Sequence, residues 1–258
     1  MDRPVLSKRM EAVMELVPED ASVVCDVGCD HAYISIRLIT DHIADKVIAM
    51  DVRKGPLDIA INNINNYGLE KTIETRLSDG LEKLLPMEAD VIIIAGMGGI
   101  LIKNILTSGC NILHSKKPPI LILQPQSDID KVRHFLYEDS YHIVKENMVF
   151  EDGKYYTVIL AYPGKMSPYD MEEEYIYGRY NIENSNPVLM SYLKKEYDMY
   201  YDILSKLNAN LQTESSKTEK NNVDIRTKKR IEEIKEKLKN NKAAYERCIK
   251  TMVRSKRG

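Results

Sequence analysis

Short apolar runs alternate with amphipathic stretches over the first 164 residues of the chain. Continuous apolar runs between helices are typical of buried parallel strands, and apolar residues three and four apart are typical of helices. We expect strands at 22–27, 46–51, 72–77, 90–95 and 119–124. We expect helices at 6–17, 31–40, 56–67, 99–108 and 128–138. This alternation predicts an α/β fold with a Rossmann-like, doubly wound parallel sheet and right-handed crossovers.

Two further strand patterns, 141–150 and 155–162, flank a turn of sequence Glu-Asp-Gly-Lys at residues 151–154. Strands that closely flank an Asp-Gly turn predict an antiparallel hairpin. The parallel sheet is therefore expected to end in two antiparallel strands.

The chain changes character around Gly164, where proline and glycine residues mark a domain boundary. We divide it into residues 1–164 and residues 165–258. The second part is expected to contain helices at 171–211, with a break at 184–187, and at 225–254, with a polar loop at 212–224. Each helix has one narrow apolar stripe, so an antiparallel coiled-coil hairpin would bury both stripes against each other.

The net charge of −2 hides an uneven distribution of charge along the chain. Residues 1–164 carry 17 basic and 24 acidic side chains, a balance of −7, and residues 165–212 carry 5 and 8, a balance of −3. Residues 213–258 carry 15 and 7, a balance of +8. A basic tail on an acidic body indicates a polyanionic partner, although a solvated helix with salt-bridged faces fits the same pattern equally well.

The composition argues against several classes of protein. No apolar run is as long as a membrane helix requires, and the first residues lack the apolar core of a secretion signal. Cys25, Cys29, Cys110 and Cys248 include no C-x-x-C pair and no histidine at metal-binding spacing, so we expect free thiols and no metal site. We therefore expect a cytoplasmic protein that does not bind membranes, and we favour a monomer.

The first strand ends in Asp26-Val27-Gly28, just before a predicted helix. The glycine allows a sharp turn close to a ligand, and the helix start offers free N–H groups. Asp51 ends the next apolar run, roughly 20 residues past the glycine, where a carboxylate can accept hydrogen bonds from a ribose diol. These features predict a cofactor that contains adenosine.

Asp30 discriminates between such cofactors. A dinucleotide-binding fingerprint has glycine at this position so that a pyrophosphate can approach, and a carboxylate would repel that group. The same carboxylate suits the ammonium and sulfonium groups of S-adenosyl-L-methionine, which we favour over NAD. An antiparallel hairpin that closes a parallel sheet is, by analogy between folds, also the expected end of a class I methyltransferase domain.

Three more segments lie at strand ends, where ligands bind in this fold. Ser78-Asp79-Gly80 offers a carboxylate to an adenine amino group, unless it forms only an Asx turn. The glycines of Ala95-Gly96-Met97-Gly98-Gly99 permit close approach of a substrate, although a packing turn would also need them. Gln124-Pro125-Gln126 could hold a base or simply end the strand, and His31 could contact a ligand or only cap a helix.

Six segments can be taken together: Leu6-Ser7-Lys8-Arg9, residues 26–33, Gly55-Pro56-Leu57, Ser78-Asp79-Gly80-Leu81, residues 95–99 and Leu123-Gln124-Pro125-Gln126. In this order they resemble the bacterial tRNA (adenine-22 N1)-methyltransferase family across residues 5–162, and the resemblance extends into the helical tail. The combination of Gly-x-Asp-His-Ala-Tyr with Ala-Gly-Met-Gly-Gly is specific, whereas either motif alone is weak. Cys29 stands where serine is expected, and Gln126 where asparagine is expected, which lengthens the amide side chain.

The resemblance implies a catalytic domain at 1–164 that binds S-adenosyl-L-methionine and a coiled-coil domain at 165–258 that binds tRNA. It implies methylation of N1 of an adenine in the D-loop region. The candidate catalytic residues are Asp30, His31, Gly96 and Met97. The candidate cofactor residues are Asp26, Gly28, Asp30, His31, Asp51, Val52, Asp79, Gly80, Ala95 and Gly96. The candidate substrate residues are Arg9, Gln124, Gln126, Lys228, Lys229 and Arg230.

Two other functions remain open from the residues themselves. One is a non-catalytic nucleic-acid-binding protein with a vestigial cofactor site, against which the set of Asp26, Gly28, Asp51 and Asp79 argues. The other is a methyltransferase that acts on a small molecule or a protein, against which the basic tail argues.

Overall fold

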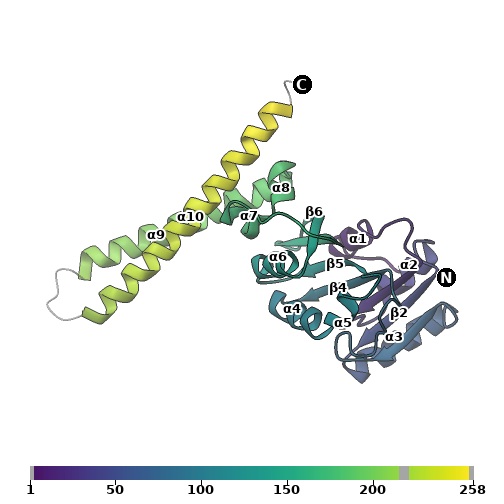
Figure 1. Ribbon diagram of the computed structural model, residues 1–258. Helices are drawn as coiled ribbons and strands as arrows, with labels where there is room; N and C mark the ends of the chain where they lie inside the picture. Colours follow the sequence, from purple (N-terminus) through teal and green to yellow (C-terminus); the bar gives the residue numbers. More distant parts are fainter. Residues whose placement is uncertain (1–2, 215–220, 256–258) are drawn as a thin grey trace. The chain divides into compact units, whose positions relative to one another are not determined.

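The computed structural model describes residues 3–214 and 221–255, and Figure 1 shows it coloured along the sequence. The chain divides into two compact units, Met1–Pro168 and Tyr169–Gly258, whereas the sequence pattern suggested a boundary after residue 164. Among the described residues, the first unit holds all the strands and the second is helical.

The first unit is built on one seven-stranded sheet with the order β3-β2-β1-β4-β5-β7-β6. The strands are β1 (Val23–Val27), β2 (Lys46–Asp51), β3 (Ile73–Leu77), β4 (Val91–Met97), β5 (Ile120–Pro125), β6 (Tyr141–Glu151) and β7 (Lys154–Pro163). Strands β1 to β5 are parallel, and β7 runs antiparallel to both β5 and β6. This order confirms the predicted doubly wound sheet and its closing hairpin. The chain places β2 and β3 on one side of β1, and β4 and β5 on the other side. Ligands bind in such sheets at this switch point between β1 and β4.

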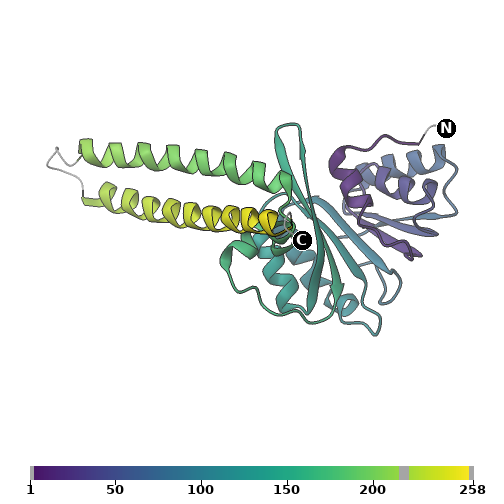
Figure 2. The same ribbon diagram turned by 90° about the horizontal axis from the view of Figure 1, so that it is seen from above.

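Helices cover both faces of this sheet (Figure 2). They are α1 (Lys8–Met14), α2 (Tyr33–Thr40), α3 (Lys54–Asn66), α4 (Gly99–Ser108), α5 (Cys110–Leu113) and α6 (Ile129–Glu138). Alternate strand residues belong to different cores: Val24 packs with α1, α2 and α3, and Cys25 packs with α4, α5 and α6. Because both faces are covered, the strands read as continuous apolar runs in the sequence.

The loop between β1 and α2 differs from its prediction. Helix α2 begins at Tyr33, so the predicted start at residue 31 is wrong. Asp30 and Ala32 have φ angles of 48° and 59°, in the left-handed region that cannot continue a right-handed helix. His31 therefore lies in a loop at the carboxyl end of β1. The short helix α5 was also not predicted, because only four residues form it.

The second unit consists of α7 (Glu172–Tyr177), α8 (Arg179–Glu183), α9 (Pro187–Glu214) and α10 (Asn221–Ser255). The predicted break at 184–187 separates α8 from α9, and Oδ1 of Asn186 accepts a hydrogen bond from the N–H of Val188 at 2.9 Å. Gly178, with a φ angle of 89°, ends α7, which is a break that the sequence analysis did not predict.

The predicted loop at 212–224 is wrong at both ends. Residues 212–214 continue α9 and residues 221–224 begin α10, since polar residues on a solvated helix resemble a loop in sequence. The middle of the predicted loop, 215–220, lies outside the described residues.

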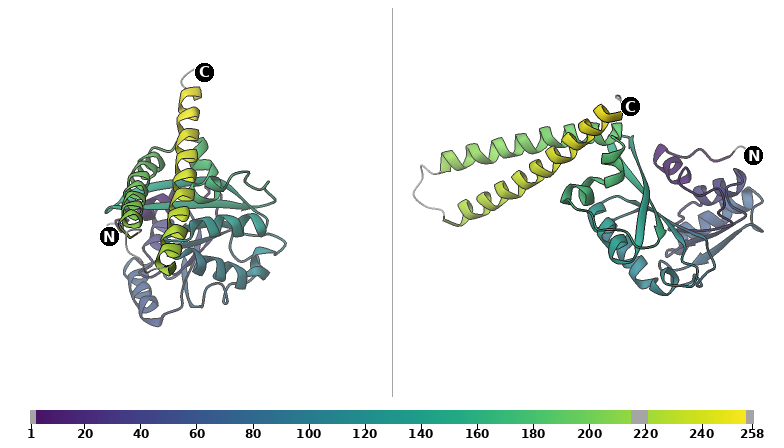
Figure 3. Two further views of the ribbon diagram at one scale, coloured as in Figure 1. Left: turned by 90° about the vertical axis from the view of Figure 1, so that its left-hand side faces the viewer. Right: turned by 45° about the horizontal axis from the view of Figure 1, so that its top comes forward.

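Helices α9 and α10 lie side by side and antiparallel (Figure 3), as the paired apolar stripes predicted. Leu193 of α9 and Ile234 of α10 are fully buried. The buried Glu196 carboxylate accepts hydrogen bonds from the Tyr177 hydroxyl at 2.6 Å and from Asn241 Nδ2 at 2.9 Å. The hydroxyls of Tyr192 and Tyr200 donate to the same carboxylate at 2.8 and 3.3 Å. Such a set of donors offsets the cost of burying a charge.

None of the helices in residues 3–214 and 221–255 combines the length and the apolar composition that a membrane span requires.

Candidate active site

A cavity of about 450 Å³ lies at the carboxyl ends of β1, β2 and β4 in the first unit. Its lining includes these residues predicted from sequence: Arg9, Asp26, Gly28, Asp30, His31, Asp51, Val52, Asp79, Gly80, Ala95, Gly96, Met97 and Gln126. These residues come from segments far apart in the sequence. The fold therefore brings all the cofactor candidates to one cavity at the point where the strand order reverses.

The turn after β1 lines this cavity. The N–H groups of Gly28 and Cys29 both donate to the carbonyl of Met50 on β2, at 2.8 and 3.0 Å. Gly28 has a φ angle of 76°, and a Cβ atom built there would collide with Cε of Met97. The positive φ angle of the turn therefore favours glycine, whereas the flexible end of the Met97 side chain could move aside for a Cβ atom.

Asp26 is a buried carboxylate in β1, directly before the last residue of the strand. Its Oδ2 accepts a hydrogen bond from the Ser35 hydroxyl of α2 at 2.6 Å. Burial raises the pKa of Asp26 to about 6; the Ser35 hydrogen bond opposes this rise, and the nearby Asp51 carboxylate adds to it. Asp26 therefore changes its charge close to neutral pH, unlike an ordinary aspartate.

Asp51 ends β2 and is also buried, with 5% of its surface exposed. Its Oδ1 accepts a hydrogen bond from the N–H of Arg53 at 2.8 Å, which fixes the carboxylate at the cavity wall. The Arg53 side chain is exposed, and its Nε lies 3.9 Å from the same oxygen. A fixed carboxylate at this strand end is suited to accept hydrogen bonds from a ribose.

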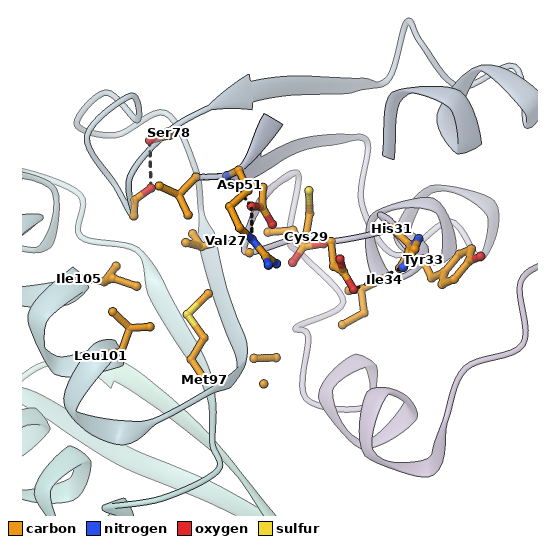
Figure 4. A pocket seen from close by; sticks show the side chains of 18 of the residues that line it. Val27, Cys29, His31, Tyr33, Ile34, Asp51, Ser78, Met97, Leu101 and Ile105 are labelled. Carbon is orange, nitrogen blue, oxygen red and sulfur yellow. Dashed lines mark hydrogen bonds and ion pairs between the residues drawn. The ribbon is translucent and has the colours of Figure 1, made fainter. Parts of the chain in front are cut away.

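The loop after β3 supplies a third carboxylate. Ser78 is buried, and its hydroxyl donates to the carbonyl of Gly80 at 3.1 Å and accepts from the N–H of Lys83 at 3.1 Å. These bonds hold the loop so that the exposed Asp79 lines the cavity. Met97, Leu101 and Ile105 line the side near this loop (Figure 4), which gives the cavity an apolar wall suited to a flat base.

Asp30, His31 and Tyr33 come from the loop after β1 and the start of α2, and they form another part of the lining. His31 Nε2 lies 3.6 Å from Asp30 Oδ2, and the His31 ring stacks on the Tyr33 ring with centroids 5.6 Å apart. Figure 4 shows His31 and Tyr33 next to each other, away from Asp51 and Ser78. The left-handed backbone at Asp30 and Ala32 costs free energy that the surrounding structure must offset, as is common at functional sites.

The substrate candidates divide into three groups. Arg9 and Gln126 line the cavity. Gln124 is fully buried and does not line it, so it has no surface to offer a base. Instead, Gln124 Oε1 accepts hydrogen bonds from Arg9 Nη1 at 2.8 Å and from the N–H of Gly96 at 3.1 Å. The remaining three candidates, Lys228, Lys229 and Arg230, are exposed on α10 in the second unit.

Several lining residues were missed by the sequence analysis. Ser78 stood in a motif in which Asp79 and Gly80 were the chosen candidates. Arg53 directly follows the candidate Val52, and Tyr33 lies two residues after the candidate His31. Leu101 and Ile105 look like ordinary core residues of a helix, and no sequence signal marks them as cavity lining.

Within residues 3–214 and 221–255, no group of three or more His, Cys, Asp or Glu side chains is arranged to hold a metal ion. The four cysteines are free thiols, of which Cys110 is exposed.

A family model described as "Methyltransferase domain" matches residues 6–159. Together with the sheet order and the cavity described above, this match identifies the first unit as a class I methyltransferase domain, the class that uses S-adenosyl-L-methionine. The tRNA (adenine(22)-N(1))-methyltransferase of Bacillus subtilis (strain 168) is 34% identical over 221 residues, which are 84% of this chain and 92% of that protein. The chain belongs to the tRNA (adenine-22 N1)-methyltransferase family, as its motifs predicted.

Solved structures agree with this assignment. One is a putative tRNA (m1A22) methyltransferase of Streptococcus pneumoniae in complex with S-adenosyl-L-methionine. It is 28% identical, has a TM-score of 0.78, and the match covers 93% of this chain and 100% of that chain. Another is TrmK of M. capricolum with S-adenosyl-homocysteine, which is 28% identical with a TM-score of 0.71, over 91% and 98% of the two chains. The prediction of S-adenosyl-L-methionine as the cofactor is thereby confirmed.

Proposed function

We propose that the protein transfers a methyl group from S-adenosyl-L-methionine to N1 of adenine 22 in tRNA. The observation that carries this proposal is the 34% identity to the Bacillus subtilis tRNA (adenine(22)-N(1))-methyltransferase over 84% of the chain. The cavity supports it independently, because its carboxylates and glycine turn match the chemistry of that cofactor.

The residues that line the cavity fit the cofactor by their chemistry. Asp51 would accept hydrogen bonds from the ribose hydroxyls, and Asp79 from the adenine amino group. Asp26 and the turn at Gly28 would hold the charged methionine end, where a carboxylate complements an ammonium group. Met97 and Ile105 would contact apolar surface of the ligand.

When bound, S-adenosyl-L-methionine supplies an electrophilic methyl group on a sulfonium. Adenine N1 carries a lone pair in the ring plane, so the protein needs no base to remove a proton from it. The residues of the cavity instead position the base and exclude water. We assign Asp30 to balance the positive charge that N1 methylation gives to the adenine ring. His31 lies 3.6 Å from Asp30, and Gly96 and Met97, the other candidate catalytic residues, line the same cavity. The target base has to be unpaired or flipped out to expose N1.

We assign tRNA binding to the helical unit. Residues 213–258 carry a balance of +8, and Lys228, Lys229 and Arg230 are exposed on α10. Such cations bind the phosphate backbone without reading its sequence, so they would add affinity rather than select the adenine. We further propose a monomer that acts in the reducing cytoplasm, where its free thiols remain reduced.

Methyl transfer to bulk tRNA that lacks modifications tests this function. The full-length protein and labelled S-adenosyl-L-methionine should produce 1-methyladenosine, detected by mass spectrometry of the nucleosides. Cofactor binding without methylation of any tRNA would contradict the proposal and favour a vestigial site.

A further inference from the structure

Three side chains that can carry positive charge line the cavity, and they differ in their partners. Arg53 Nε lies 3.9 Å from an Asp51 oxygen, and His31 Nε2 lies 3.6 Å from Asp30. Arg9 is half-buried, and no carboxylate among residues 3–214 and 221–255 lies within 4.0 Å of its guanidinium. The Glu151 carboxylate attracts this guanidinium electrostatically without forming an ion pair with it. A partly desolvated guanidinium that forms no ion pair is well suited to bind an anion.

The Arg9 side chain is held in place by neutral groups. Nη1 donates to Oε1 of the buried Gln124 at 2.8 Å, and the guanidinium carbon lies 5.7 Å from the centre of the Tyr156 ring. Gln124 Oε1 also accepts the N–H of Gly96, so the same atom joins Arg9 to the loop after β4. A guanidinium has five N–H donors, and Gln124 engages one of its nitrogens. Among residues 3–214 and 221–255 no further acceptor bonds the Arg9 side chain, so its other nitrogens are available for a ligand.

The backbone of Arg9 is held by a carboxylate that lies 142 residues away in the sequence. Glu151, the last residue of β6, accepts the N–H of Lys8 on Oε1 at 2.7 Å and the N–H of Arg9 on Oε2 at 3.2 Å. These N–H groups belong to the first turn of α1, which has no intrahelical acceptor for them. The closing hairpin therefore fixes the position from which the Arg9 side chain extends.

We propose that Arg9 is an oxyanion-binding residue of the cavity and that Glu151 and Gln124 are its positioning residues. The inference rests on the function proposed above. A guanidinium is unsuited to contact a ring that becomes positively charged on methylation, whereas it pairs with two oxygens of one anion. Two groups in the reaction carry such oxygens: the α-carboxylate of S-adenosyl-L-methionine and a phosphodiester next to the target adenosine.

The first experiment compares full-length wild type, Arg9→Ala and the matched control Arg3→Ala by calorimetry and initial rates. Arg3 is an exposed arginine near the same terminus that pairs with Asp41, so its removal changes the net charge equally. If the anion is the cofactor carboxylate, Arg9→Ala weakens S-adenosyl-L-methionine binding by roughly tenfold or more. It then leaves the affinity for decarboxylated S-adenosyl-L-methionine unchanged.

If the anion is a phosphodiester, Arg9→Ala leaves cofactor affinity unchanged and raises KM for tRNA by roughly tenfold, with little change in kcat. A tRNA ligated with one neutral methylphosphonate on either side of the target adenosine then removes the difference between wild type and variant. The proposal would be overturned if Arg9→Ala and Arg3→Ala had the same affinity for S-adenosyl-L-methionine and the same KM for tRNA. The calorimetric arm does not need methyl transfer, so it remains informative even if the proposed tRNA substrate is wrong.

The second experiment separates positioning from general stability. Glu151→Ala should raise whichever constant Arg9→Ala raises, either the Kd for S-adenosyl-L-methionine or the KM for tRNA. Glu151→Gln should keep that constant close to its wild-type value, because an amide oxygen still accepts an N–H. In the Arg9→Ala background, Glu151→Ala should have no further effect. An equal loss in both backgrounds would show that Glu151 only stabilises the fold, and would overturn its positioning role.

Discussion

The carboxylate of Asp26 and the hydroxyl of Ser35 form a 2.6 Å hydrogen bond that joins the end of β1 to helix α2 at the wall of the cavity. Burial raises the pKa of Asp26 to about 6 in spite of this bond, and the Asp51 carboxylate adds to the rise. Because the folded-state pKa lies above the ordinary aspartate value of 3.8, ionising Asp26 opposes folding. Its contribution to stability is present below about pH 4 and is lost as the pH rises through 6.

Cofactor binding should show the opposite dependence on pH. Ionised Asp26 complements the ammonium group, so binding should tighten by roughly tenfold from pH 5 to pH 7, with a midpoint near 6. Calorimetry across this range measures it. Asp26→Asn should bind weakly with a flat profile, and Ser35→Ala should move the midpoint upward, because the hydroxyl opposes the rise in pKa. The same slope in Asp26→Asn would exclude Asp26 as the titrating group.

Asp51 should contribute to cofactor affinity through the ribose. Asp51→Ala should weaken S-adenosyl-L-methionine binding by roughly 1.5–3 kcal/mol, the usual loss for hydrogen bonds to a charged group. Asp51→Asn is the matched control, since its oxygen can still accept the N–H of Arg53 and keep the loop in place. Thermal unfolding of both variants reports any loss of fold. Unchanged affinity of a folded Asp51→Ala protein would remove this residue from the site.

Asp30 should act on the rate rather than on tRNA binding. We expect Asp30→Asn to lower kcat for methyl transfer by roughly tenfold or more while the Kd for tRNA changes little, because the charge it balances develops on the ring during the reaction. Single-turnover kinetics and filter binding measure the two quantities. A variant that loses tRNA affinity but keeps its single-turnover rate would show that Asp30 is a binding residue.

The first unit should keep cofactor binding without the helical unit. A protein that ends at Pro168 retains the whole sheet, its covering helices and every cavity residue. It should bind S-adenosyl-L-methionine with the affinity of the full chain. It should lose most tRNA binding, because 15 of the 37 basic residues lie in residues 213–258. Full methylation of tRNA by this fragment would leave the helical pair with a structural role.

The sheet could be predicted from sequence because strands that are buried on both faces consist of consecutive apolar residues, as in β4. Asp26 and Asp51 were recognisable for a related reason, since each follows apolar residues at a strand end. The start of α2 was not predictable, because the left-handed backbone at Asp30 and Ala32 is imposed by the surrounding fold and leaves no residue pattern.

Contacts between segments that are far apart in the sequence could not be predicted either. Gln124 was read as a residue that could hold a base, and its role became clear only when the fold brought Arg9 and Gly96 to its Oε1. The bond from Glu151 to the start of α1 spans 142 residues to Arg9. A single sequence records the type of each residue but not such pairings, which depend on how the closing hairpin meets the first helix.

The most direct test of the central claim uses two tRNA transcripts that differ at one position. The first carries adenine at position 22, and the second carries guanine there. Each is incubated with the full-length protein and S-adenosyl-L-methionine, and the methylated nucleosides are located by mass spectrometry of nuclease fragments. We predict 1-methyladenosine at position 22 of the first transcript and no methylation of the second. Equal methylation of both transcripts, or methylation of neither, would contradict the account.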